Sequence, residues 1–271
     1  MPAIAEQRLY VDGPFGQIHV RDAAPTTGPG AKPALICFHQ SPISGAQFRL
    51  FQRVLAEDRR VICPDTPGYG KSDPPPAVPS MTDYARAMAA MAERLQLHAV
   101  DVLGFHTGSQ IAVELAAARP DLVRRVVLSS LALFTAEELA RNRAGFGGPR
   151  PLFTDPAYVG RYYREQVTDG LPGISPERRL ELFTDRISAG EKSWYGPEAV
   201  FTHPTEQRLR DVRQPTLLLA LRDTLAPNTR RAASLMSNAV VVDRPDIHGP
   251  PGWDAMPGEI AAEVRRFLDA A

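Results

Sequence analysis

The sequence predicts an α/β fold with a mostly parallel sheet and one helical insertion. Apolar segments of strand length alternate with segments of helical periodicity over residues 1–130, and the alternation resumes over residues 214–271. Strands separated by helices are typical of βαβ units, in which the strands run parallel. Residues 131–213 interrupt this pattern, because they are rich in helical segments, glycine, proline and aromatic side chains but contain no convincing strand. A third observation is a glycine-flanked histidine where a strand meets a helix.

The predicted elements follow in order along the chain. An opening hairpin turns at Asp12-Gly13-Pro14, because glycine and proline between two short apolar runs favour a tight turn. Central strands are expected at residues 34–38, 60–64, 99–104 and 125–129, with helices at residues 46–57, 81–95 and 107–118. The insertion is expected to form helices at residues 136–143, 155–167 and 175–188. A strand from Thr216 and a helix over residues 260–268 end the chain.

The amino-acid composition limits the kinds of binding partner that we expect for this protein. The chain has 271 residues, 44% of them hydrophobic, which is enough for one large α/β domain with a full core. Lys and Arg (31) balance Asp and Glu (31), and no basic block stands out, so we expect neither nucleic acid nor an anionic membrane as a partner. The expected partner is a small molecule. Composition leaves the oligomeric state open, a homodimer included.

No targeting or membrane signal is evident in the sequence. The first residues include Glu6 and Arg8, and no apolar run approaches the ~18 residues that span a bilayer, so a cytoplasmic location is expected. The two cysteines, Cys37 and Cys63, lie in apolar runs that are predicted to be strands. We expect them to be small core residues and not a reactive pair, because a reactive thiolate needs an accessible position.

The most informative motif is Gly104-Phe105-His106-Thr107-Gly108, between a predicted strand and a predicted helix. A G-x-S-x-G sequence at such a junction forms a strained turn that holds a nucleophilic serine above the sheet. Here the glycines keep their spacing while histidine replaces serine. The sequence therefore predicts the same turn with an imidazole at its apex, where serine alkoxide chemistry is unavailable.

Four further motifs in the right order extend this resemblance, at residues 35–42 (LICFHQSP), 65–73 (DTPGYGKSD), 216–223 (TLLLALRD) and 246–249 (DIHG). With them the chain resembles the α/β hydrolases, in particular the cap-bearing branch that includes proline iminopeptidases, haloalkane dehalogenases and epoxide hydrolases. The resemblance implies a mostly parallel eight-stranded sheet flanked by helices. It assigns residues 1–130 and 214–271 to the core and residues 131–213 to a helical cap over the carboxyl ends of the strands, where such sheets bind ligands.

The order of the site loops implies a triad of His106, Asp223 and His248, since α/β hydrolases place elbow, acid and histidine in this order. Asp223 would accept a hydrogen bond from His248 and fix its tautomer. The alternatives are a helix-capping role for Asp223 and a surface loop position for His248. The resemblance also implies an oxyanion hole made by the backbone N–H groups of Ser41 and Thr107.

The sequence leaves several roles open for His106. It can act as a nucleophile, or as a general base or donor beside His248. It can also belong to a metal site with Asp223 and His248, or stand in an inactive elbow. We expect a hydrolase without cofactor or metal that cleaves an ester, lactone, amide or C–C bond of a small, mostly apolar molecule. The alternatives are a cofactor-free lyase, decarboxylase or isomerase, and a non-catalytic small-molecule receptor.

Other side chains are expected at the substrate or at the surface. Gln40 replaces the glycine that the family has in its first site loop, and it would either crowd the oxyanion hole or add an amide donor to it. The residues expected to contact substrate are His39, Gln40, Phe105, Trp194 and Tyr195. The remaining histidines, His19, His98 and His203, are expected at the surface or in capping positions.

Overall fold

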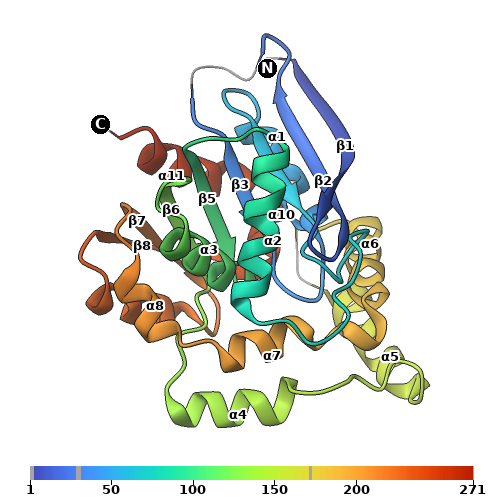
Figure 1. Cartoon of the computed structure of the whole chain (residues 1–271). Coiled ribbons are helices and arrows are strands. Elements are labelled where there is room, and N and C mark those ends of the chain that lie inside the picture. Colours follow the sequence, from blue (N-terminus) through green and yellow to red (C-terminus); the bar gives the residue numbers. More distant parts are fainter. Residues whose placement is uncertain (1–2, 29–31, 171–172, 271) are drawn as a thin grey trace.

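A computed structural model describes residues 3–28, 32–170 and 173–270 (Figure 1). Eight strands form one sheet in the order β1-β2-β4-β3-β5-β6-β7-β8, in which β3 to β8 run parallel and the β1–β2 hairpin pairs antiparallel to β4. The mostly parallel, eight-stranded sheet predicted from the sequence is confirmed. The strands are β1 (Ile4–Gly13), β2 (Gly16–Pro25), β3 (Leu35–Phe38), β4 (Val61–Pro64), β5 (Val100–Phe105), β6 (Val123–Ser129), β7 (Thr216–Arg222) and β8 (Ala239–His248).

Helices cover both faces of the sheet (Figure 1). One face carries α2 (Met81–Arg94), α3 (Thr107–Ala118) and α8 (Thr205–Asp211), and the other carries α1 (Arg49–Leu55), α10 (Gly249–Ala255) and α11 (Pro257–Leu268). Helix α9 (Ala226–Arg231) follows β7. Among the described helices, none has both the length and the apolar character needed to cross a bilayer.

Two hydrophobic clusters, one on each face, explain the continuous apolar runs of the central strands. In β3, Ile36 and Phe38 belong to one cluster while Leu35 and Cys37 belong to the other. Side chains alternate along a strand, so a strand buried on both faces needs apolar residues at every position. Cys37 and Cys63 are free thiols that are fully buried in the second cluster, as expected of small core residues.

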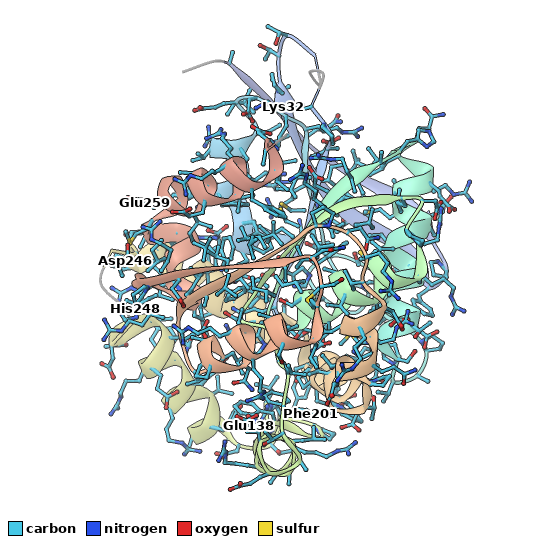
Figure 2. All side chains as sticks on the ribbon, turned by 90° about the vertical axis from the view of Figure 1, so that its left-hand side faces the viewer. Lys32, Glu138, Phe201, Asp246, His248 and Glu259 are labelled. Atoms are coloured by element: carbon cyan, nitrogen blue, oxygen red, sulfur yellow. The ribbon has the colours of Figure 1, made fainter. Side chains whose placement is uncertain are left out.

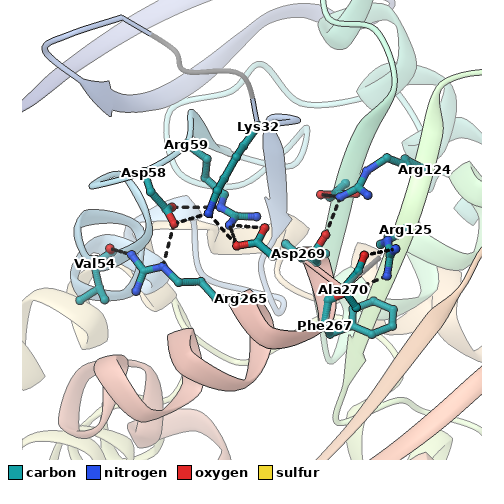
Figure 3. Close-up of polar contacts among 12 residues, drawn as sticks. Lys32, Val54, Asp58, Arg59, Arg124, Arg125, Arg265, Phe267, Asp269 and Ala270 are labelled. Carbon is teal, nitrogen blue, oxygen red and sulfur yellow. Dashed lines mark hydrogen bonds and ion pairs between the residues drawn. The ribbon is translucent and has the colours of Figure 1, made fainter.

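A network of ion pairs and hydrogen bonds holds the C-terminal helix to the body of the protein (Figure 3). Asp269, at the end of α11, accepts hydrogen bonds from Arg59 (2.8 Å) and Lys32 (2.6 Å). Asp58 accepts from Lys32 (2.8 Å) and from Arg265 (3.1 Å) on α11. Three of these four contacts join residues more than 200 positions apart in sequence, and they hold the last helix, α11, against the body of the protein.

The chain between β6 and β7 forms helices α4 (Ala136–Phe146), α5 (Pro156–Tyr163), α6 (Pro176–Ser188) and α7 (Tyr195–Thr202), which lie with α8 toward one end of the sheet (Figure 1). The described residues of this region contain no strand. Thr135 begins α4 with a reciprocal cap to Glu138, and Ser175 caps α6 ahead of Pro176. The helix predicted over residues 155–167 is shorter, because Arg164–Thr168 forms a π-helical turn.

Two histidines expected at the surface or in capping positions have buried rings. The Nδ1 atom of His19 lies 2.8 Å from a carboxylate oxygen of Asp65. His203 contacts Gln110 (2.9 Å) and Glu114 (3.1 Å) on α3. The expectation was wrong for His19, whose ring has a polar partner that only tertiary structure brings near it. His203 is the C-cap residue of α7, one of the two positions expected for it, although its ring is buried against α3. His98 is exposed, as expected.

Candidate active site

The histidine-bearing turn joins β5 directly to α3. His106 is the N-cap residue of α3 and has φ 57° and ψ −117°, a conformation that L-residues rarely adopt. A Cβ atom at Gly104 would lie 2.3 Å from the carbonyl oxygen of Gly108, and one at Gly108 would lie 1.9 Å from that of Phe38. Only glycine fits at these two positions. The spacing of the glycines thus produces the tight strand-to-helix turn that the sequence predicted.

His106 lines a cavity of about 310 Å³ between the sheet and the region of α4 to α7. Gln40, Ser41 and Thr107 form the wall on the side of the sheet, and Phe201 contributes from α7. The rest of the wall is mostly apolar and aromatic, with a few polar groups, as in most small-molecule sites. These other residues are Pro42, Ala132, Phe134, Asn142, Phe146, Arg150, Leu152, Tyr158, Tyr162, Arg186, Ile187, Ser193, Pro197, Val200, Thr224 and Leu225.

The imidazole of His106 is uncharged at neutral pH. Its pKa is lowered from 6.5 to about 4, first because the ring is removed from water and second because the positive charge of Arg186 opposes protonation. A neutral imidazole has a free lone pair on one ring nitrogen. This position can therefore accept a proton or attack an electrophilic carbon over the physiological pH range.

The two backbone groups expected to form an oxyanion hole lie side by side. The N–H of Ser41 points at the hydroxyl of Thr107, at a long distance of 3.3 Å. Thr107 is the first residue of α3, where backbone N–H groups have no partner within the helix. Gln40 lines the cavity, and its own backbone N–H is bonded to the side chain of Gln47 (3.1 Å). Because the N–H of Ser41 already points at the Thr107 hydroxyl, the use of these two N–H groups as an oxyanion hole remains a prediction.

The acid and the second histidine of the expected triad do not meet. Asp223 accepts a short hydrogen bond from the hydroxyl of Ser130 and a 2.8 Å bond from the N–H of Leu225, so one oxygen caps the turn into α9. Burial raises the pKa of its carboxyl group. The His248 side chain is exposed and lies near the outer edge of the molecule (Figure 2).

The backbone nevertheless places these two loops together. Arg222 pairs with His248 in the sheet, and a Cβ atom at Gly249 would lie 2.4 Å from a carboxylate oxygen of Asp223. The expected hydrogen bond between Asp223 and His248 is absent from the contacts of the described residues, because Ser130 occupies the carboxylate and the imidazole points outward. A role for these two residues remains a prediction.

Four of the five expected substrate contacts lie outside the cavity wall. His39 is buried, and its ring accepts from the N–H of Thr66 (2.8 Å) and contacts the carbonyl of Gln40 (2.8 Å), so it fixes the loop. Phe105 points into the core, 5.2 Å from the Trp253 ring. Trp194 and Tyr195 pack on each other at 5.4 Å, and the wall positions are taken by their sequence neighbours Ser193 and Pro197. Only Gln40 lines the cavity as expected.

Several polar side chains of the wall were not singled out in the sequence, Asn142 and Thr224 among them. Arg150, Arg186 and Ser193 all come from the inserted region. Arg186 lies on α6, whereas Arg150 and Ser193 lie between helices. Their place at the cavity depends on how the helices pack, and no motif marks them. Ser130 was also missed, although its positive φ of 52° immediately after β6 places its hydroxyl against Asp223.

Within residues 3–28, 32–170 and 173–270, no cluster of three or more His, Cys, Asp or Glu side chains has the arrangement of a metal site. His106, Asp223 and His248 do not converge on one point, which a facial metal site requires.

The tight turn after β5, the parallel sheet and the helices inserted over its carboxyl edge define a protein of the α/β-hydrolase class. The chain matches the family described as alpha/beta hydrolase fold over residues 33–245, and it belongs to that family.

Among named relatives, the chain is 27% identical over 187 residues to 2-hydroxy-6-oxo-2,4-heptadienoate hydrolase of Pseudomonas putida, a match that spans 66% of each protein. It is 28% identical over 228 residues to 2-hydroxy-6-oxononadienedioate/2-hydroxy-6-oxononatrienedioate hydrolase 2 of the same species, with 75% of this chain and 73% of the relative covered. The structure is similar to that of the enol-lactonase from Burkholderia xenovorans LB400, with a TM-score of 0.81, 17% identity, and 97% and 100% of the two chains covered.

Proposed function

We propose that this protein is a cofactor-free hydrolase of a small, mostly apolar molecule and that neutral His106 is its catalytic base. The observation that carries the proposal is an imidazole with a pKa of about 4 on a strained turn that faces a cavity of about 310 Å³. Strain is retained at positions where surrounding structure fixes a side chain for a task. The relatives named as hydrolases support the reaction class, and an ester, lactone, amide or activated C–C bond fits the cavity.

In the proposed reaction, His106 removes a proton from a water molecule as its oxygen attacks the carbonyl carbon. The N–H groups of Thr107 and Ser41 stabilise the negative oxygen that forms. The protonated imidazole then returns the proton to the leaving group, so that one residue serves as base and then as acid. Direct attack by His106 on the carbonyl is the second route, and it would leave an acyl-imidazole intermediate.

Variants at the two histidines test the proposal. We expect His106→Ala to lower kcat/KM for p-nitrophenyl acetate and for a small enol lactone at least 100-fold, the usual contribution of a general base. His248→Ala is the matched control, because its imidazole is exposed outside the cavity, and it should retain most of the activity. Equal losses in both variants would favour the triad of His106, Asp223 and His248. Wild-type turnover in His106→Ala would overturn the proposal.

Two measurements separate the routes that His106 can take. A burst of p-nitrophenol, together with a mass increase on the peptide that contains His106, identifies nucleophilic attack. Linear product formation without an adduct identifies general-base catalysis. His106→Ser adds a third comparison, since it supplies a hydroxyl at the turn. It should gain weak esterase activity only if His248 turns inward to activate that hydroxyl.

A second candidate is proton transfer without hydrolysis, as in a cofactor-free lyase, decarboxylase or isomerase. It is favoured by one observation: His106 is the member of the expected triad that lines the cavity, and a single base is sufficient to remove a proton next to a carbonyl group. Exchange of a substrate C–H for deuterium in D₂O without bond cleavage would support this candidate.

A further inference from the structure

The charged side chains of the cavity wall are all positive. Two arginines, Arg150 and Arg186, line the cavity, and no Asp or Glu does so among the described residues. Arg150 donates to the carbonyl oxygen of Gly145 (2.9 Å) and lies over the ring of Phe146 (5.2 Å). Its guanidinium group is therefore partly engaged by backbone next to it. The cavity as a whole suits a molecule with a negative group and an apolar body.

Arg186 is the better placed of the two cations. It lies in the last turn of α6, is half-buried, and forms no ion pair with a carboxylate among the described residues, although its guanidinium lies over the ring of Tyr162 at 6.0 Å. The adjacent Asp185 accepts hydrogen bonds from the N–H (2.8 Å) and the hydroxyl (2.7 Å) of Ser44, which anchors this turn of the helix to the core. Arg186 is thus a cation on an anchored turn of α6 that contacts Tyr162 and has no carboxylate partner among the described residues.

A second donor lies in the same wall. Ser193 is only 4% exposed, lines the cavity, and its hydroxyl has no hydrogen-bond partner in the described structure. A buried hydroxyl without a partner costs free energy, and because this one lines the cavity, a water molecule or a bound ligand can satisfy it. Arginine binds carboxylates strongly because its planar donors match the two oxygens.

We propose that the substrate of this site carries a carboxylate, which the guanidinium of Arg186 binds with the hydroxyl of Ser193 as a further donor. The inference rests on the proposed function only in treating the bound molecule as a substrate. The carboxylate-binding site itself is inferred from the residues of the cavity wall. The aromatic side chains of the wall, Phe134, Tyr158 and Phe201 among them, enclose the apolar part of the molecule.

Carboxylate binding has a consequence for His106. The positive charge of Arg186 is one of the two causes that lower the pKa of His106. A bound carboxylate would offset that charge, so the pKa of His106 should rise when substrate binds, which strengthens the imidazole as a base. Tyr162, which also lines the cavity, does not oppose this effect, because burial raises the pKa of its hydroxyl and keeps it neutral.

Calorimetry with phenylacetate and with its neutral analogue phenylacetamide tests the proposal without turnover. The wild-type protein should bind phenylacetate at least 10-fold more tightly. Arg186→Met should weaken phenylacetate binding about 10- to 100-fold and leave phenylacetamide unchanged, and Arg186→Lys should retain part of the preference. Ser193→Ala should weaken phenylacetate binding about 3- to 10-fold.

Arg161→Met is the matched control, because it removes the same charge from the inserted region at a side chain that is 64% exposed and pairs with Asp155 outside the cavity. It should leave both affinities unchanged. Equal binding of the two probes by the wild-type protein would overturn the proposal even if a variant failed to fold. So would an equal effect of Arg161→Met and Arg186→Met on phenylacetate.

The pKa of His106, followed by NMR of labelled histidine, gives an independent readout. It should rise in Arg186→Met, and it should rise in the wild-type protein on addition of phenylacetate. An unchanged pKa in both experiments would contradict the coupling. Carboxylate binding without turnover of any ester or lactone would overturn the hydrolase and leave this inference intact. Equal kcat/KM for substrates with and without a carboxylate would overturn the carboxylate-binding site and leave the proposed hydrolase intact.

Discussion

The inserted region has two halves that are held to the core in different ways. Helices α6 to α8 are anchored by polar groups that are buried: Arg178 on α6 binds Asp254 (2.8 Å) and the carbonyl of Ala46 (2.7 Å), and the hydroxyl of Tyr69 accepts from the N–H of Gly196 (2.6 Å) on α7. Helices α4 and α5 contain no buried residue.

This difference separates two tasks of a substrate site. The anchored half supplies the polar groups that need a fixed position, Arg186 and Ser193, while the loosely attached half supplies mostly apolar and aromatic wall, such as Phe146 and Tyr158. Segments with few buried contacts open at lower free energy than the rest of a protein. We therefore expect substrate to enter past α4 and α5 while α6 remains in place.

The largest expected effect comes from the buried ion pair of the anchored half. Arg178 and Asp254 have side chains that are 6% and 4% exposed. Arg178→Met should lower the free energy of unfolding by about 3–5 kcal/mol, because it leaves a buried carboxylate without its partner. Chemical denaturation measures this. Adding Asp254→Asn should recover part of the loss, and a single variant as stable as the wild type would contradict the anchoring role.

A smaller effect is expected where His203 and α8 meet α3. The pKa of Glu114 is lowered from 4.5 to about 2, chiefly by its hydrogen bond with His203 and also by Arg208. The carboxylate therefore stabilises the folded state above pH ~4.5, and this contribution, up to about 3 kcal/mol, is lost as the pH falls toward 2. Glu114→Gln should be less stable at pH 7 and should converge with the wild type near pH 2. Parallel stability curves for the two proteins would show that Glu114 is not the group involved.

The smallest effect is expected in the loosely attached half. Arg143 on α4 forms an ion pair with Glu198 on α7, and the arginine side chain is 47% exposed. Exposed pairs contribute about 0–1 kcal/mol, so Arg143→Met should leave the free energy of unfolding nearly unchanged. It should instead increase the rate of amide exchange in α4. A loss as large as that of Arg178→Met would remove the distinction between the two halves.

The sequence was sufficient for the fold because its signals are local and ordered. The turn at residues 104–108 depends on two glycines whose missing Cβ atoms can be inferred from spacing alone, and the apolar runs of β3 and β5 predict strands buried on both faces. The assignment of residues 131–213 to a separate cap also came from local sequence patterns, and it stays a prediction.

The site was less predictable because it depends on which face of each helix turns inward. Trp194 and Tyr195 were expected at the substrate as aromatic residues of the inserted region, yet their neighbours Ser193 and Pro197 line the cavity. The motif order implied that Asp223 and His248 form a pair, but it could not reveal that Ser130 competes for the carboxylate. Arg186 carries no motif and is recognised only by its position.

The strain at position 106 lies in the backbone and not in the side chain that occupies it. The turn is enforced by Gly104 and Gly108 and by close contact with Phe38, none of which depends on an imidazole. The turn therefore places the side chain at position 106 against the cavity, whichever residue occupies that position. In evolutionary terms, a lineage can exchange the reactive group by point mutation without rebuilding the fold, so that the chemistry and the architecture of such a protein can diverge at different speeds.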